Sequence, residues 1–381
     1  MTIPGSRLVF FVLLSLISVL MGHAAAGAFF VFVGTYTGDD PEGGVHVLRF
    51  DPSAETLELT GQVGRCANPA FVAVHPNGRY LYAVGETGEP DANQVVAFAI
   101  DGMTGGLARL NQRSSGGFGP CHLVVDPGGR WVLVANYGDG SVATLEIEAD
   151  GRLGESGANL KHTGRSADPV RQSSPHAHSI NLTPDGRRAL VADLGLDKVM
   201  IYWFDPEDGR LIPNFPPFSQ VEPGSGPRHL AFSRDGARVY VLNEMAGNLT
   251  VFSYQASTGG MEPIQTIDML PGGWEGERSG AEVLVHPNGK FLYASNRGHD
   301  SIALFAVDQG TGLLRSMGHV PSGGMNPRNF AIDPTGGFLF AANQNSNSIV
   351  VFRIGDEGHL MRTDMKVSVP RPVCVRFGDA E

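Results

Sequence analysis

The stretch that decides the fold runs from Gly226 to Glu244 and reads Gly-Pro-Arg-His-Leu-Ala-Phe-Ser-Arg-Asp-Gly-Ala-Arg-Val-Tyr-Val-Leu-Asn-Glu. Two apolar runs flank an Asp-Gly turn, a pattern that predicts a β-hairpin. Variants recur at Asn68 to Glu86, Gly119 to Tyr137, Pro175 to Leu194, Ser279 to Arg297 and Asn326 to Gln344. The turn glycines stand at 78, 129, 186, 236, 289 and 336, so the intervals are 51, 57, 50, 53 and 47 residues. This period is typical of repeat proteins built from four-stranded blades.

The two ends of the chain complete the repeat. Three strands are expected near the N-terminus, within Phe29 to Val63, without an innermost hairpin partner. Pro372 to Phe377 is predicted to form a lone innermost strand. Pairing it with the N-terminal blade closes the ring and removes an exposed sheet edge. Six hairpins and this composite blade predict one all-β domain over residues 29–381, a seven-bladed β-propeller of four-stranded antiparallel blades.

Residues 1–28 have the pattern of a secretory signal peptide: the single charge of Arg7, an apolar run from Leu8 to Met21, then small residues. The run is shorter than the ~20 residues that span a bilayer, which disfavours the alternative of a membrane anchor. A periplasmic or secreted protein without stable membrane insertion is therefore expected.

The charge and the cysteines narrow the class of partner. Without Arg7 the chain has 39 acidic and 27 basic side chains, a formal charge of −12, which disfavours nucleic acid and anionic membranes. Cys66, Cys121 and Cys374 have no metal or redox spacing, and we expect no disulfide framework. We expect a monomer whose partner is a small-molecule substrate.

Turn symmetry predicts where functional residues meet. Residues equidistant from the turn face each other in an antiparallel pair, so Arg228 and Glu244, eight residues either side of Gly236, should meet at the open end of their hairpin. By strand alternation, His229 should point toward a neighbouring blade instead. In radially arranged blades, the equivalent positions form a ring on one face: Ala70, Glu86, Cys121, Tyr137, His178, Leu194, Arg228, Glu244, Ala281, Arg297, Arg328 and Gln344.

Five segments of the chain form a recognisable set: the Pro76-Asn-Gly-Arg-Tyr-Leu-Tyr type of turn, Pro175-His-Ala-His-Ser-Ile, Gly226-Pro-Arg-His, Asn243-Glu244 and Ser295-Asn-Arg297. Together they resemble the seven-bladed propeller lactonase family, which includes propeller-type 6-phosphogluconolactonases and a carboxymuconate-cyclising enzyme. The resemblance covers the chain after residue 28 and implies an active-site set of His178, Arg228, Glu244 and Arg297. All four stand at the ring positions that turn symmetry gives.

Each of these residues also has a structural interpretation. His178 is equally typical of a hydrogen-bonded core histidine, and Arg228 with Glu244 of a cross-strand ion pair. Arg297 and Arg328 in an acidic chain suggest an anionic ligand. His176, Arg328, Glu86, Tyr137 and Gln344 are candidate substrate-binding residues, and His176 competes with His178 for the histidine role.

The expected chemistry is hydrolysis of a sugar lactone, phosphorylated or not, by a carboxylic ester hydrolase. Glu244 or His178 would transfer protons and arginines would stabilise negative charge, without a metal, a cofactor or a covalent intermediate. The sequence has no Gly-x-Ser-x-Gly, His-Glu-x-x-His or Cys-x-x-Cys motif. A muconate-type lactonising cyclase, a non-catalytic exported binding propeller and a metal-dependent six-bladed lactonase are the alternatives; blade count disfavours the last.

Overall fold

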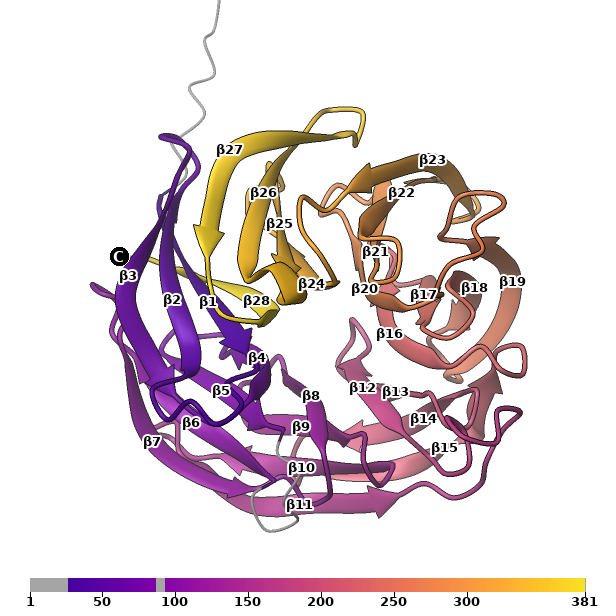
Figure 1. The fold of residues 1–381 in the computed structure, drawn as a ribbon. Helices are drawn as coiled ribbons and strands as arrows, with labels where there is room; N and C mark the ends of the chain where they lie inside the picture. The colour runs from indigo at the N-terminus through magenta and orange to yellow at the C-terminus, as the bar shows by residue number, and fades with distance from the viewer. Residues whose placement is uncertain (1–26, 87–92, 381) are drawn as a thin grey trace, which may run out of the picture.

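Seven four-stranded antiparallel sheets surround a common centre (Figure 1). The computed structural model describes residues 27–86 and 93–380 of the 381-residue chain. Within these ranges the one helical segment is a 3₁₀ turn, η2 (Gln344–Ser346). The predicted all-β seven-bladed propeller is confirmed.

The strands of the first four blades follow the chain from the N-terminus. They are β1 (Phe29–Thr35), β2 (Gly44–Asp51), β3 (Thr56–Arg65); β4 (Pro69–Val74), β5 (Tyr80–Gly85), β6 (Gln94–Ile100), β7 (Leu107–Ser114); β8 (Pro120–Val125), β9 (Trp131–Asn136), β10 (Ser141–Ile147), β11 (Leu153–Lys161); β12 (Ala177–Leu182), β13 (Arg188–Asp193), β14 (Lys198–Asp205) and β15 (Arg210–Gln220).

The remaining strands are β16 (Pro227–Phe232), β17 (Arg238–Asn243), β18 (Asn248–Gln255), β19 (Gly260–Asp268); β20 (Gly280–Val285), β21 (Phe291–Asn296), β22 (Ser301–Val307), β23 (Leu314–Pro321); β24 (Pro327–Ile332), β25 (Phe338–Asn343), β26 (Ser348–Ile354), β27 (Leu360–Ser368) and β28 (Pro372–Asp379).

The last strand closes the ring as predicted. β28 pairs with β1 as the innermost strand of the first blade, and the register joins Val33 to Val375 and Phe29 to Asp379. In Figure 1 the end of the chain, in yellow, lies beside the indigo strand β1. The paired segment is two residues longer than Pro372 to Phe377, because the ladder continues to Asp379.

Apolar runs form these strands because each blade is covered on both faces by its neighbours. Every residue of β5, β9 and β21 is buried, whereas the outermost strand β3 is mostly exposed. The first and last blades interlock through Phe50, whose ring meets Phe338 and Phe340 edge-on at centroid distances of 5.2 and 4.9 Å. Side-chain packing between blades thus supplies the core of the ring.

The turn glycine has a conformational reason to be glycine. Gly236 has φ of 68°, a left-handed conformation that other residues adopt at a cost. Its N–H donates to the Ser233 carbonyl at 2.9 Å, which closes a four-residue turn. The next pair in the ladder is Phe232 with Val239, so the hairpin axis falls between Asp235 and Gly236. The prediction that residues equally far from Gly236 pair across the hairpin was therefore wrong.

A β-bulge shifts the register once more at the open end of each inner hairpin. In β16 the pairing passes from His229–Leu242 to Pro227–Asn243, and Arg228 is the extra residue. Glu244 is consequently opposite Gly226, to whose carbonyl its N–H donates at 2.7 Å, and not opposite Arg228 as predicted. Equivalent shifts occur in the other innermost strands. A bulge re-aims side chains, so these shifts direct ring residues toward the central mouth.

All three cysteines are buried free thiols. The predicted signal peptide lies, apart from its last two residues, outside the described residues. Within the described ranges, no helix has the length and apolar character that crossing a membrane requires.

Candidate active site

A cavity of about 320 Å³ opens at the centre of the ring face. Its wall combines side chains from the bulges, from the residues that follow the second strands, and from loops. They are Glu86, Cys121, Tyr137, Arg171, His178, Glu244, Glu277, Ser279, Arg297 and Arg328. Six of the nine candidate residues from the sequence meet here, and Arg228, His176 and Gln344 lie outside the wall.

Glu244 is the most heavily contacted residue of the cavity. Arg171 Nη2 donates to Oε1 at 2.7 Å, and Arg297 Nη2 lies 2.8 Å from Oε2. Arg228 Nε is 3.1 Å from Oε2, an ion pair without hydrogen-bond direction, and His178 Nε2 is 3.7 Å from Oε2. The side chain is only 8% exposed. Glu244 therefore joins three arginines from three parts of the chain.

These contacts govern the ionisation of Glu244. Burial alone would raise the pKa of Glu244, but the charges of Arg297 and Arg228 and the hydrogen bond from Arg171 outweigh burial and hold that pKa far below its usual range. The carboxylate stays ionised, and a group with such a low pKa accepts a proton poorly.

Arg228 lies behind Glu244, with a side chain only 4% exposed. Its Nη1 donates to the carbonyl of Ala281 in the next blade and to His229 Nε2 at 3.2 Å. Burial, with the charge of Arg297 second, lowers the pKa of Arg228 to about 10, so it remains a cation at neutral pH. From this position it fixes Glu244.

A second layer of buried polar groups supports Arg228. His229 Nδ1 donates to Glu282 Oε1 at 2.8 Å, and Asn329 Nδ2 donates to Glu282 Oε2. The backbone N–H of Val375 in the closing strand donates to Asn329 Oδ1 at 2.9 Å. His229 thus reaches the neighbouring blade as expected, and its Nε2 also accepts the hydrogen bond from Arg228 Nη1.

His178 is a neutral imidazole at neutral pH. Burial, followed by the charge of Arg228, lowers the pKa of His178 well below its ordinary value. Its Nε2 faces Glu244, and its Nδ1 lies 3.8 Å from Cys121 Sγ. Burial also raises the pKa of the Cys121 thiol, so this wall residue is a poor nucleophile.

Another part of the wall is organised by Tyr36, which follows β1. Tyr36 Oη donates to Glu86 Oε2 at 2.6 Å and accepts from Arg328 Nη2 at 2.8 Å. The Arg328 guanidinium also lies over the Tyr36 ring, 5.2 Å from its centroid. Neither Glu86 nor Arg328 has an ion-pair partner within 4 Å among the residues that the structure describes.

Two candidate binding residues lie behind the wall. His176 stacks on Tyr137 with ring centroids 4.5 Å apart, and its Nδ1 hydrogen-bonds the Tyr137 carbonyl at 2.8 Å. Gln344 accepts a hydrogen bond from Asn326 Nδ2 at 3.3 Å. His176 thus supports a wall residue, whereas Gln344 contacts a loop.

Arg171 was missed in the sequence because it lies in the irregular stretch before β12, where no strand period applies. Buried contacts hold this segment: His162 Nδ1 pairs with Asp193 Oδ2 at 2.5 Å, and Gln172 Nε2 donates to the Leu194 carbonyl at 2.8 Å. The Arg171 side chain is 44% exposed, so it stands at the rim of the cavity. Its place opposite Glu244 is a result of tertiary structure.

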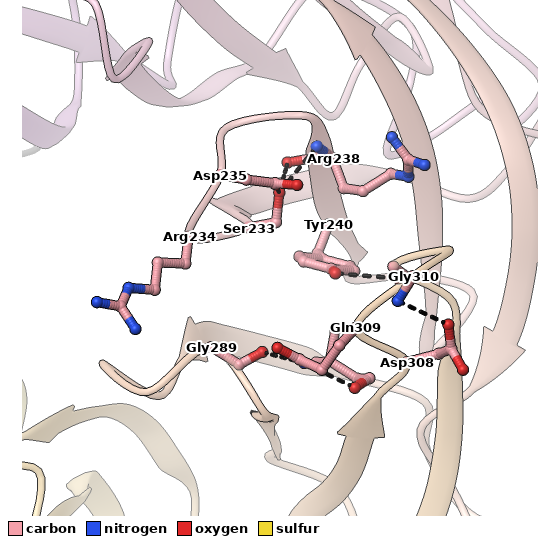
Figure 2. A pocket seen from close by; sticks show the side chains of 11 residues that line it. Ser233, Arg234, Asp235, Arg238, Tyr240, Gly289, Asp308, Gln309 and Gly310 are labelled. Carbon is pink, nitrogen blue, oxygen red and sulfur yellow. Dashed lines mark hydrogen bonds between the residues drawn. The ribbon is translucent and has the colours of Figure 1, made fainter.

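Another cavity, of about 390 Å³, lies where the β16–β17 and β22–β23 turns meet, at the ends of the strands away from the ring face. Figure 2 shows the side chains that line it. Its polar groups bond within and between these turns. Ser233 Oγ donates to Asp235 Oδ1 at 2.6 Å, and Tyr240 Oη donates to the Gly312 carbonyl at 3.0 Å. The first bond lies within one turn and the second joins neighbouring blades, so the cavity is explained by the packing of turns.

Within residues 27–86 and 93–380, no group of three or more His, Cys, Asp or Glu side chains is arranged to hold a metal ion. The chemistry available in the ring-face cavity comes from its arginines, its carboxylates and a neutral imidazole.

Comparisons with known proteins agree with this architecture. The family described as "Lactonase, 7-bladed beta-propeller" matches residues 30–377. The 6-phosphogluconolactonase of Bacillus subtilis is 35% identical over 347 residues, 91% of this chain and 97% of the relative. The 6-phosphogluconolactonase of Formosa agariphila is 35% identical over 307 residues, 80% of this chain and 86% of the relative.

A solved structure is similarly close. The periplasmic gluconolactonase PpgL of Pseudomonas aeruginosa superposes with a TM-score of 0.88 at 34% identity, covering 93% of this chain and 100% of that structure. Family match, sequence identity and superposition each extend over nearly the whole propeller. The chain therefore belongs to the seven-bladed β-propeller lactonase family.

Proposed function

We propose that the ring-face cavity hydrolyses a sugar lactone, as a 6-phosphogluconolactonase-like carboxylic ester hydrolase, and that the substrate, phosphorylated or not, carries an anionic group, either a phosphate or a carboxylate. The observation that carries the proposal is Arg328, which lines the cavity without an ion pair among the described residues, while its neighbour Glu244 is held by three arginines. An arginine of this kind suits an anionic ligand group or the oxyanion that forms when water attacks a carbonyl. The names of the relatives, 6-phosphogluconolactonase and gluconolactonase, support a sugar lactone.

His178, Arg228, Glu244 and Arg297 have separate roles in this proposal. Arg297 reaches the cavity and stabilises negative charge, while Arg228 and Glu244 hold the arginine cluster in place. His178 remains uncharged beside them and contacts the substrate without adding to the positive charge. No metal or cofactor is assigned to these steps.

The test is a panel of lactones assayed for acid release in a pH-stat. Glucono-δ-lactone, its 6-phosphate and muconolactone should be opened at different rates, and the anionic sugar lactone should be opened fastest. The activity should be retained after EDTA treatment. Arg328→Met should lower kcat/KM by about 10²- to 10³-fold, the usual effect of removing a charge-stabilising donor.

Other outcomes identify the alternatives. Consumption of a muconate with lactone formation, without hydrolysis of sugar lactones, would favour a lactonising cyclase. Saturable binding of a lactone without turnover would favour a binding propeller. Activity that EDTA abolishes and a divalent cation restores would overturn the metal-independent mechanism.

We also propose that the protein is exported to the periplasm or secreted, and that it is a monomer with no nucleic-acid or membrane partner. The pattern of residues 1–28 and the periplasmic relative support export. N-terminal sequencing of exported protein should begin near Ala28 or Phe29, and an intact Met1 would contradict cleavage. Light scattering should give the mass of one chain.

A further inference from the structure

Two of the three carboxylates that line the cavity, Glu86 and Glu244, differ in what surrounds them. Both oxygens of Glu244 contact arginines, whereas Glu86 Oε2 accepts one hydrogen bond, from Tyr36 Oη at 2.6 Å. Among the described residues Glu86 Oε1 has no hydrogen-bond donor and no cation within 4 Å, although Glu86 lines the same cavity. A carboxylate oxygen that is free of cations is the one that can take up a proton.

Tyr36 separates Glu86 from Arg328. Its hydroxyl donates to Glu86 and accepts from Arg328 Nη2 at 2.8 Å, while the guanidinium stacks over its ring. The carboxylate and the guanidinium are therefore held near each other but not paired. A base for water and a cation for a carbonyl oxygen are the two groups that lactone opening requires, and a direct ion pair would consume both.

The other candidate bases are less suitable. Glu244 is held by Arg171, Arg228 and Arg297, and its low pKa makes it a weak base. Both ring nitrogens of His178 face protein groups, Nε2 toward Glu244 and Nδ1 toward Cys121. The division resembles other enzymes in which two carboxylates take different roles because their environments differ.

We propose that Glu86 is the general base of the reaction, that Tyr36 positions it, and that Arg328 stabilises the carbonyl oxygen. This inference rests on the proposed lactone hydrolysis and assigns its proton transfer to a residue outside the set His178, Arg228, Glu244 and Arg297.

The step balances with water as the only co-reactant. As the water oxygen bonds to the carbonyl carbon, Glu86 Oε1 takes one water proton, and the carbonyl electron pair becomes an oxyanion facing Arg328. The oxyanion then re-forms the carbonyl and breaks the bond to the ring oxygen. The departing ring oxygen takes the proton from Glu86, which returns to the carboxylate, and the hydroxy acid product releases a proton to solvent.

The experiment compares Glu86→Gln and Glu86→Ala with the parent on the lactone that the parent opens fastest. Glu86→Gln keeps the acceptor for Tyr36 but removes the base, so kcat should fall by about 10²- to 10⁴-fold with KM changed less than about threefold. In Glu86→Ala, added formate should restore turnover in proportion to its concentration, because a free carboxylate can occupy the vacated place. Glu262→Gln, an exposed carboxylate on β19, is the matched control and should leave kcat unchanged.

Three results would overturn the assignment while leaving the proposed function intact. They are a kcat of Glu86→Gln close to that of the parent, a loss that appears only in KM, and a loss in Glu86→Ala that formate does not relieve although thermal melting shows a folded protein. Failure of the parent to open any lactone would instead refute the proposed function itself. Tyr36→Phe should give an intermediate loss in kcat, because it leaves the base but removes the bond that orients it.

Discussion

Removing residues 371–381 is expected to abolish cooperative folding. The deletion strips the innermost strand from the first blade, including Val373 and Val375, which are 2% and 0% exposed. Burying each valine contributes about 1.5–3 kcal/mol, and the unpaired edge of β1 adds the cost of lost ladder bonds. The polar layer under Arg228 also loses the Val375 N–H. Together these losses are comparable to the whole stability of a domain, about 5–15 kcal/mol.

Two related chains make this test specific. Deleting only residues 380–381 leaves β28 complete and should keep the parent melting temperature. A circular permutant that places residues 371–380 before residue 27 should fold, because Asp379 pairs with Phe29 and a short hairpin can join the two strands. A truncated chain that melts cooperatively at the parent temperature would contradict the role of the closing strand.

Acidification from about pH 8 to about pH 5 is expected to lower the free energy of unfolding steeply. His122, His178 and His229 are buried close to one another, with the His229 ring centroid 5.3 Å from that of His122 and 5.6 Å from that of His178. Burial is the largest cause that lowers the pKa of each well below the ordinary 6.5. Below pH 6.5 the unfolded chain binds protons at these histidines that the folded protein does not bind. Their contribution to the free energy of unfolding is therefore fully present above this pH and is lost as the pH falls. Each such proton lowers the unfolding free energy by up to about 1.4 kcal/mol per pH unit.

One buried carboxylate opposes this trend. Burial raises the pKa of Glu282, so the folded protein takes up a proton there before the unfolded chain does. A net difference of two to three protons gives a slope approaching about 3–4 kcal/mol per pH unit below pH 6.5. Urea unfolding across this range measures the slope. His122→Gln should reduce this slope by the contribution of one proton, up to about 1.4 kcal/mol per pH unit. An unfolding free energy that does not change with pH would show that these histidines are not held neutral.

Repetition of one hairpin determines most of the fold. The six turn glycines mark the inner hairpins, and each has a positive φ between 67° and 77°. The N-terminal blade lacked an innermost strand and the C-terminal strand lacked a blade, so the sequence predicted that the two pair. β28 does pair with β1. These predictions succeed because strand period and turn chemistry are local properties, and because stacking of similar blades leaves little choice of arrangement.

The arrangement within the cavity depends on register, which turn symmetry alone does not supply. Counting from Gly236 placed Arg228 opposite Glu244, whereas the turn axis and the bulge together place Gly226 there. The two side chains still form an ion pair, but Arg228 lies behind the cavity wall. His229 reaches Glu282 of the neighbouring blade, as strand alternation predicted. A bulge depends on how a whole sheet bends, and no single residue type marks it.

The sequence by itself determined the all-β repeat, the closure of the ring and the face on which Glu86, His178, Glu244, Arg297 and Arg328 gather. Only the tertiary structure decided which of these side chains are paired and which are free. Arg171 comes from an irregular segment and Tyr36 from the loop after β1, and neither carries a periodic pattern that would place it at the cavity. Their contacts nevertheless leave Glu244 paired with three arginines, whereas Glu86 has no ion pair among the described residues and is linked to Arg328 only through Tyr36. Pairing of charges is a property of distance in space, which local sequence patterns do not encode.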